Sequence, residues 1–325
     1  MKTVLVTGAA GYIGSHALLD LKENEYGTVA LDNLSEGHIE ALQGGSLEEV
    51  DLADLPSLNS LFRERDIDAV VHFAASAYVG ESVKDPRKYY QNNVVCSFNL
   101  LNAMLDNDVK NIVFSSSCAA YGNPVYVPID EKHQLNPISP YGNTKYIIEK
   151  TLADYKRAYG LNYIALRYFN AAGAHESARI GESHNVETHL IPLVLQTLTG
   201  KREYIEVFGD DYDTPDGTCI RDYIHVSDLA CAHRLAVERL LCGKESAAVN
   251  LGTGIGHSVK EIIDVCEKVV GRNVDYRTAC RREGDPPVLV AANEFAKEIL
   301  SWRPEYVDIE DIVRTAWNWE KNRKY

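Results

Sequence analysis

Short apolar runs alternate with longer amphipathic stretches through the first half of the chain. The apolar runs are rich in Val, Ile, Leu and Phe, as buried strands are, and they span residues 3–7, 28–31, 69–73, 111–115 and 163–168. The stretches between them predict helices, among them 12–22, 55–65 and 90–106. This alternation of strands and helices favours an α/β fold with a doubly wound parallel sheet and helices on both faces.

The rhythm changes after Asn170. Residues 171–188 are rich in Gly, Ser, Glu and His and predict a loop, after which helix and strand signals resume in shorter pieces. We therefore expect residues 1–170 to form the doubly wound (Rossmann) domain and residues 171–325 to form a second, smaller α/β substrate lobe. The segment 224–252 is expected to return to the first domain.

Composition and charge exclude several classes of protein. The chain has 325 residues, 45% of them hydrophobic, and a net charge of −14, which argues against a nucleic-acid binder. No stretch approaches the roughly 18 apolar residues of a membrane span, and the start of the chain resembles no signal peptide, so a cytoplasmic protein is expected. The seven cysteines show no CxxC pair and there is no HExxH motif, so neither disulfides nor a metal is expected.

A glycine pattern marks a candidate dinucleotide site. Gly8, Gly11 and Gly14 lie where the first predicted strand meets the first predicted helix, and Asp32 ends the second strand. Glycine permits a tight turn and close approach of a pyrophosphate to the helix N-terminus. A carboxylate about twenty residues further on binds ribose hydroxyls and repels a 2′-phosphate, which favours NAD over NADP. The alternative is a tight turn with a solvated Asp32.

Two other motifs imitate binding sites. The segment 252–256 (GTGIG) has the right glycines, but no acid-capped strand–helix–strand unit follows it, so it predicts a loop that touches substrate. The segment 210–217 is faintly similar to a calcium loop, but its glycine is misplaced and Pro215 interrupts the ligand spacing.

Tyr141 and Lys145 form a candidate catalytic pair. Their spacing of four places both side chains on one face of a helix that starts near Pro140. A lysine ammonium near a phenol favours the phenolate, so we expect the pKa of Tyr141 to be lowered enough for general base catalysis. Ser117, at the end of a strand, can hydrogen-bond the reacting oxygen. Taken alone, such a pair is more often an ordinary surface pair.

Together these motifs resemble the extended short-chain dehydrogenase/reductase superfamily. Within it, the chain is similar over nearly its whole length to the UDP-glucose 4-epimerase family, through Leu31-Asp32-Asn33-Leu34-Ser35, Tyr89-Tyr90-Gln91-Asn92-Asn93, Arg167-Tyr168-Phe169-Asn170 and Gly217-Thr218-x-x-Arg221-Asp222-Tyr223-Ile224-His225-Val226. The resemblance implies an enzyme that epimerises C4 of a UDP-hexose, interconverting UDP-glucose and UDP-galactose. Tyr141 would remove the 4-hydroxyl proton, Ser117 would help to shuttle it, and NAD would accept and return the C4 hydride.

The resemblance also implies which residues contact each ligand. The cofactor contacts would be Gly8, Gly11, Tyr12, Ile13, Gly14, Asp32, Asn33, Ser35, Asp51, Leu52, Phe73, Ala74, Ala75, Asn92, Ser115, Tyr141, Lys145 and Tyr168. The substrate contacts would be Ser117, Tyr141, Asn170, His189, Leu190, Val207, Phe208, Arg221, Tyr223, Arg282 and Asp285. Among these, Arg221 and Arg282 would hold the diphosphate, and Val207 and Phe208 would form the uracil platform. A homodimer is expected.

At four positions the chain differs from the family pattern, so the sequence does not determine which UDP-sugar is the substrate. They are Ala77 for a lysine, Ala119 for a threonine, Thr188-His189 for Asn-Asn, and Leu289 for a tyrosine. UDP-N-acetylglucosamine and UDP-xylose 4-epimerases are therefore alternatives. A nucleotide-sugar 4,6-dehydratase would place Asp-Glu after Ser117, where this chain has Cys118. A non-enzymatic NAD sensor would not need Tyr141, Lys145 and Ser117 together.

Overall fold

A seven-stranded parallel sheet forms the larger part of the molecule. The computed structural model describes residues 1–282 and 285–325. The strand order is β10-β6-β5-β4-β1-β2-β3. Successive strands are therefore added on one side of β1 as far as β3 and on its other side from β4 onward. The strands are β1 (Thr3–Thr7), β2 (Gly27–Asp32), β3 (Leu47–Glu49), β4 (Ala69–His72), β5 (Asn111–Ser117), β6 (Asn162–Tyr168) and β10 (Ala247–Leu251).

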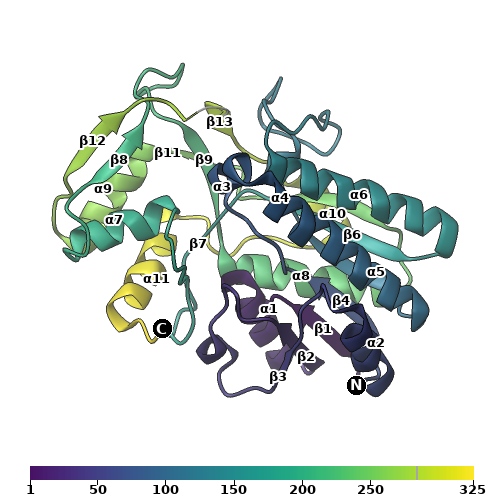
Figure 1. The fold of residues 1–325 in the computed structure, drawn as a ribbon. Coiled ribbons are helices and arrows are strands. Elements are labelled where there is room, and N and C mark those ends of the chain that lie inside the picture. The colour runs from purple at the N-terminus through teal and green to yellow at the C-terminus, as the bar shows by residue number, and fades with distance from the viewer. Residues whose placement is uncertain (283–284) are drawn as a thin grey trace.

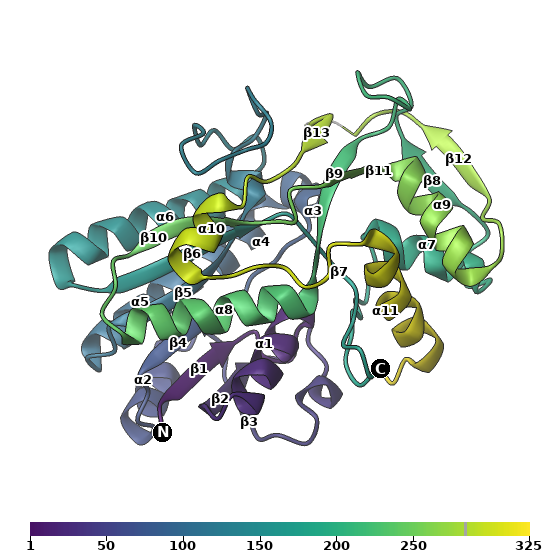
Figure 2. The same ribbon diagram turned by 180° about the vertical axis from the view of Figure 1, so that it is seen from behind.

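Helices cover both faces of this sheet (Figures 1 and 2). One face carries α1 (Tyr12–Glu23), α8 (Val226–Leu241) and α10 (Glu294–Leu300), and the other carries α2 (Leu55–Glu64), α5 (Cys96–Asp106) and α6 (Pro140–Tyr159). Side chains alternate along β1 accordingly: Val4 and Val6 enter the first core and Leu5 enters the second. A strand buried on both faces needs apolar residues throughout, which is why the runs are continuous. The predicted doubly wound fold is confirmed.

A smaller α/β part lies beside the carboxyl ends of these strands. Its sheets contain β7 (Asn170–Ala172), β9 (Ile220–His225), β11 (Gly256–Ser258) and β13 (Val288–Leu289), with β8 (Ile205–Phe208) pairing with β12 (Tyr276–Ala279). Its helices α7 (Leu190–Leu198), α9 (Val259–Val270) and α11 (Ile309–Asn322) share one hydrophobic core with β8 and β9. The chain crosses between the parts, because β10 pairs with β6 of the large sheet.

The predicted helix over 90–106 differs from the observed one in its first turns. After α3 (Val79–Lys84) and α4 (Pro86–Tyr89), residues Tyr90–Val95 form a π-helix that leads into α5. The wider turn accompanies a set of hydrogen bonds made by Asn93, whose amide binds the backbone N–H and C=O of Ser76 at 2.8 and 2.9 Å and the Thr144 hydroxyl at 3.1 Å. This π-helix therefore ties the segment after β4 to α6.

A buried ion pair joins α6 to β6. The Arg167 guanidinium donates to the Glu149 carboxylate from Nε at 2.9 Å and from Nη2 at 2.5 Å, and both side chains are 6% exposed. Arg167 also donates to the Tyr121 hydroxyl at 3.0 Å, and Ser116 donates to Glu149. Each charge thus has both an opposite charge and further hydrogen bonds, as burial requires.

We predict that Glu149→Gln lowers the free energy of unfolding by about 3–5 kcal/mol, because it leaves the Arg167 charge buried without compensation. Urea unfolding measures the change. Asp154→Asn is a matched control on the same helix, since Asp154 pairs with Arg157 in solvent, with side chains 64% and 77% exposed. Equal midpoints for the two variants would contradict this account.

Candidate active site

The turn between β1 and α1 leaves no room for a side chain at two of its glycines. Gly8 has φ +69°, and a Cβ on it would lie 2.7 Å from the Ala74 amide nitrogen. A Cβ on Gly14 would lie 2.0 Å from the Gly8 carbonyl oxygen. Gly11 caps α1 without any side-chain hydrogen bond, so the N-terminus of this helix is open to an external anion. The turn fits a dinucleotide pyrophosphate.

Asp32 fixes the turn from the end of β2. Its carboxylate accepts the Ala10 N–H and the Leu34 N–H, each at 2.9 Å. Burial raises the pKa of Asp32, against smaller lowering by these backbone N–H groups. A buried acceptor at this strand end suits ribose hydroxyls.

Further predicted cofactor residues lie along the same edge. The Asn33 amide donates to Asp51 at 2.9 Å, and the Ser35 hydroxyl donates to the Asn33 amide oxygen at 2.7 Å. Asn92 donates to the Ser76 hydroxyl at 3.1 Å, beside the segment 73–75 that follows β4. Leu52 is buried in the second core, and Ile13 packs against the first.

Tyr12 joins the two parts of the molecule. Its hydroxyl donates to the Gly173 carbonyl at 2.6 Å. The first residue of α1, predicted as a cofactor contact, is therefore also anchored to the chain that enters the smaller lobe.

α6 brings the predicted catalytic residues to the ends of β5 and β6. Ser139 caps the helix by accepting the Gly142 N–H at 3.1 Å, and Pro140 fixes its first turn. Lys145 donates to the Ser115 carbonyl at 2.8 Å, and its Nζ lies 5.8 Å from the centre of the Tyr141 ring. Ser117 closes β5 beside Tyr141.

The pKa expected for Tyr141 is wrong for this structure. Burial raises the pKa of Tyr141 to about 12, and the neighbouring Ser117 hydroxyl lowers it only in part. Burial also lowers the pKa of Lys145 to about 7, against an opposing effect of Glu149. Desolvation disfavours both charged forms, and a lysine that holds its proton weakly does little to favour a phenolate.

Tyr168 completes this end of the site. Its hydroxyl is hydrogen-bonded to the Ser115 hydroxyl at the end of β5. Burial raises its pKa, and the neighbouring Tyr141 adds to the shift. Tyr141, Tyr168 and Lys145 thus meet around Ser115.

The predicted substrate residues gather on β9 and its neighbours. In the strand registers, Arg221 lies opposite Leu289 of β13, and Tyr223 lies opposite Asn170 of β7. Arg221 forms an ion pair with Asp285.

Arg282 occupies a different position from Arg221. Its guanidinium lies over the Phe208 ring, 4.0 Å from the ring centre, at the end of β8 where Val207 is buried. Leu289 packs in the apolar cluster that contains Cys118, next to Ser117. The predicted substrate residues on β9 and β13 therefore lie next to the predicted catalytic residue Ser117.

Sequence reasoning missed a cluster in the predicted loop. Glu182, His184, Glu187 and His189 converge there, and His189 is hydrogen-bonded to Glu182 immediately before α7 begins at Leu190. A histidine pair at helical spacing is the usual sequence signal of a metal site, whereas these side chains lie along an irregular segment. The GTGIG loop is tied to β9, because its Thr253 and Gly254 N–H groups donate to Asp222 at 2.8 and 3.0 Å, and its contact with substrate stays a prediction.

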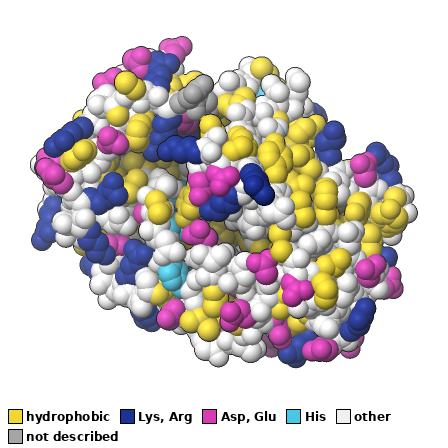
Figure 3. Space-filling model, in the orientation of Figure 1, with side chains coloured by type: hydrophobic (Ala, Val, Ile, Leu, Met, Phe, Trp, Pro, Cys, Tyr) yellow, Lys and Arg dark blue, Asp and Glu magenta, His cyan; other side chains and the backbone are white. Residues whose placement is uncertain are grey.

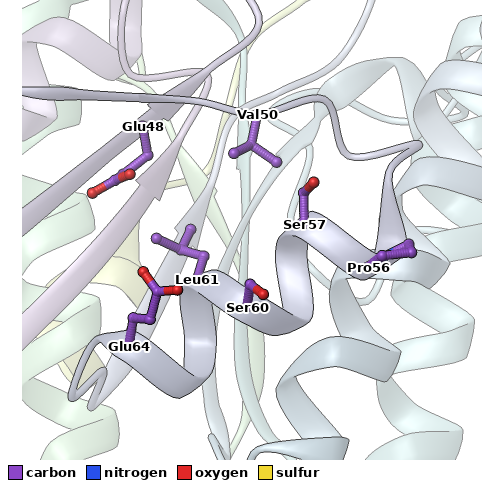
Figure 4. A pocket seen from close by; sticks show the side chains of 7 residues that line it. All are labelled: Glu48, Val50, Pro56, Ser57, Ser60, Leu61 and Glu64. Carbon is purple, nitrogen blue, oxygen red and sulfur yellow. The ribbon is translucent and has the colours of Figure 1, made fainter.

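The candidate site and the pocket between β3 and α2 lie at different places on the surface. Figure 3 shows a depression between the two parts, with basic, acidic and histidine side chains around it. Figure 4 shows a pocket between β3 and α2, lined by Glu48, Val50, Pro56, Ser57, Ser60, Leu61 and Glu64. β3 is the edge strand furthest from β6 and β10, so this pocket is separate from Tyr141.

Comparison with known proteins identifies the class of the chain. Residues 4–252 match the model of the NAD dependent epimerase/dehydratase family, and the chain belongs to that family. A curated relative, the UDP-glucose 4-epimerase of Halalkalibacterium halodurans, is 52% identical over 322 residues, which are 99% of this chain and 96% of the relative. The predicted family resemblance is confirmed.

Two solved structures are similar to this fold throughout. UDP-glucose 4-epimerase from Brucella ovis in complex with NAD is 51% identical, with a TM-score of 0.95 and 98% of each chain covered. The Bifidobacterium longum enzyme in complex with NAD⁺ and UDP is 37% identical, with a TM-score of 0.94 and 99% of each chain covered. In the described ranges 1–282 and 285–325, no helix is long and apolar enough to cross a membrane.

We predict that Gly14→Ala loses the bound dinucleotide and lowers the free energy of unfolding by about 1–3 kcal/mol, because the new methyl group would collide with the Gly8 carbonyl. The nucleotide released on denaturation and a urea titration measure the two effects. Gly80→Ala is the matched control, since a Cβ there meets nothing within 4 Å. Retention of nucleotide and stability by Gly14→Ala would contradict the close packing.

Proposed function

We propose that this chain is an NAD-dependent epimerase that interconverts UDP-glucose and UDP-galactose at C4. The observation that carries the proposal is the meeting of Tyr141, Lys145 and Ser117 at the carboxyl ends of β5 and β6, on the same sheet edge as the glycine turn, with β9 and Arg221 continuing the same site. Membership of the NAD dependent epimerase/dehydratase family and the close epimerase relatives support it.

The residues divide the chemistry between them. Tyr141 would accept the proton of the sugar 4-hydroxyl as a phenolate, which the positive charge of bound NAD⁺ would favour against the burial that raises its pKa, and the Ser117 hydroxyl would relay that proton. NAD⁺ held at the glycine turn would supply the acceptor for the C4 hydride and the donor for its return. Lys145, held by the Ser115 carbonyl, binds the nicotinamide ribose and orients Tyr141. Tyr141 is buried, so the site largely shields its hydroxyl from bulk solvent.

The cofactor lies along the carboxyl edge of the large sheet. We assign its pyrophosphate to Gly8, Gly11 and Gly14 with the first turn of α1 (Tyr12, Ile13), since that helix end lacks a side-chain cap. The adenosine side is assigned to Asp32, Asn33, Ser35, Asp51 and Leu52. The remaining contacts are Phe73, Ala74, Ala75, Asn92, Ser115 and Tyr168.

The nucleotide of the substrate binds the smaller lobe. Arg221 and Arg282 hold the diphosphate, for which a guanidinium fork is suited. Val207 and Phe208 receive the uracil, and the further contacts are Asn170, His189, Leu190, Tyr223 and Asp285. The functional division is then residues 1–170 with 224–252 for NAD, and the rest of 171–325 for the UDP-sugar.

A cytoplasmic homodimer is the form we propose. Apolar side chains gather over α3 to α6 (Figure 3), where Val79, Val83, Tyr90 and Val95 are 47%, 61%, 38% and 42% exposed. A contiguous apolar surface of this kind suits a second copy of the chain. All seven cysteines are free thiols, which fits a reducing compartment.

The rival activities have less support. Dehydration requires an acid beside Ser117, but burial raises the pKa of the adjacent Cys118 thiol to about 12. Activity on an N-acetylated UDP-sugar tests the selectivity of the site. Leu289, which lies opposite Arg221, is smaller than the tyrosine that the family has at this position.

The test of function is conversion of UDP-galactose to UDP-glucose without added cofactor. Tyr141→Phe should reduce kcat by about 10²–10⁴, because the proton acceptor is lost while the buried ring is kept. Tyr159→Phe, on the same helix and 56% exposed, is the control. A wild-type protein that epimerises only UDP-N-acetylhexosamines or UDP-xylose would overturn the sugar assignment, and full activity in Tyr141→Phe would overturn the mechanism.

Arg221→Ala and Arg282→Ala should each weaken UDP binding about 10- to 100-fold, the effect of losing a charged hydrogen bond. Isothermal titration of the NAD-loaded protein with UDP measures it. Arg281→Ala is the neighbouring control, because Arg281 pairs instead with Asp211 at 2.7 Å. Equal weakening in all three variants would indicate a general charge effect and not a diphosphate site.

A further inference from the structure

Four potential metal ligands converge between Glu182 and His189. The Nδ1 atom of His184 lies 3.4 Å from carboxylate oxygens of both Glu182 and Glu187. Nδ1 of His189 is hydrogen-bonded to the same oxygen of Glu182, and one ligand atom from each of the four residues lies within 4.8 Å of the others. Four potential donors thus lie close together on a short segment of chain.

The separations and the donor types suit zinc. Four ligands at about 2.0–2.1 Å from a tetrahedral ion are about 3.3–3.4 Å apart, close to the distances around His184. Two imidazoles and two carboxylates are the nitrogen and oxygen donors that zinc accepts. Small side-chain rotations would bring the remaining pairs to this spacing.

Charge gives a separate argument. The Glu182 and Glu187 side chains are each 5% exposed, although carboxylates are rarely buried without compensation. Among the described residues, their ion-pair partners are His184 and His189, with no lysine or arginine. A divalent cation that displaces the imidazole protons would cancel the two buried negative charges.

The cluster lies where the two parts of the molecule meet. The His184 ring is edge-on to Tyr12 of α1 and to Tyr78, with ring centres 6.4 and 5.8 Å apart. We propose that Glu182, His184, Glu187 and His189 bind one zinc ion, which fixes the segment 182–189 against the NAD-binding part. Four protein ligands leave no open position on the ion, so its role is structural. With Nδ1 of His189 on the ion, Nε2 of the same ring remains available for the substrate contact proposed above.

The test uses the NAD-loaded protein after chelator treatment and dialysis. Wild type should bind one equivalent of Co²⁺ with the visible absorption of a tetrahedral N/O site, and Zn²⁺ should displace it and raise the melting temperature. His184→Gln and Glu187→Gln should each weaken Zn²⁺ binding at least about tenfold, since each removes one of four ligands. His175→Gln is the control, because His175 lies in the same loop but bonds Ser177.

Bound NAD and circular dichroism report whether each variant is folded, independently of turnover. Absence of stoichiometric Co²⁺ or Zn²⁺ binding by wild type would overturn the proposal and leave a hydrogen-bonded ion-pair cluster. Equal binding by wild type and by both ligand variants would also overturn it, by locating the metal elsewhere. Zinc binding confined to proteins that retain Glu187 and His184 would support it, whatever sugar the enzyme prefers.

Discussion

The Glu149 carboxylate is the contact on which the arrangement of the site depends. Tyr141, Lys145 and Glu149 recur every four residues on one face of α6, which places all three against β5 and β6. Glu149 receives hydrogen bonds from Arg167 of β6 and Ser116 of β5, so it fixes the rotation of the helix against both strands. It also opposes the loss of charge that burial imposes on Lys145. One buried acid therefore fixes the helix that carries the proposed catalytic pair and favours the charged form of Lys145.

The topology explains why cofactor and catalytic residues share one edge. Parallel strands end on the same side of a sheet, and a crevice opens where the strand order reverses, here between β1 and β4. The glycine turn after β1, the segment after β4 and Ser117 at the end of β5 all lie along that edge. The smaller lobe starts directly from the end of β6, so its first strand, β7, carries Asn170 toward the same crevice.

Much of this could be predicted from the sequence because it depends on local spacing. The continuous apolar runs indicate strands buried on both faces, and the glycines and Tyr141-x-x-x-Lys145 indicate a turn and a helix face. The pKa of Tyr141 could not be predicted, because it depends on how much solvent the tertiary fold removes. The Glu182–His189 cluster was missed because an irregular loop has no fixed period. The π-helix at Tyr90 depends on hydrogen bonds to Ser76 and Thr144, which are distant in sequence.

The chain is acidic overall, although the substrate proposed for the site is an anion. An arginine held in place by an ion pair provides the positive charge locally. The chain has a net charge of −14, yet Arg221 is held in the cleft by Asp285, a residue that is itself a proposed substrate contact. This pair keeps the guanidinium oriented and partly neutralised until a diphosphate competes for it. Because Arg221 lies opposite Leu289 in the β9–β13 register, the anchor for the diphosphate and the side chain proposed to border the sugar share one strand pair. A bulkier residue at 289 would therefore act on the sugar from a position fixed relative to the phosphates, which is why selectivity can change there without altering Tyr141.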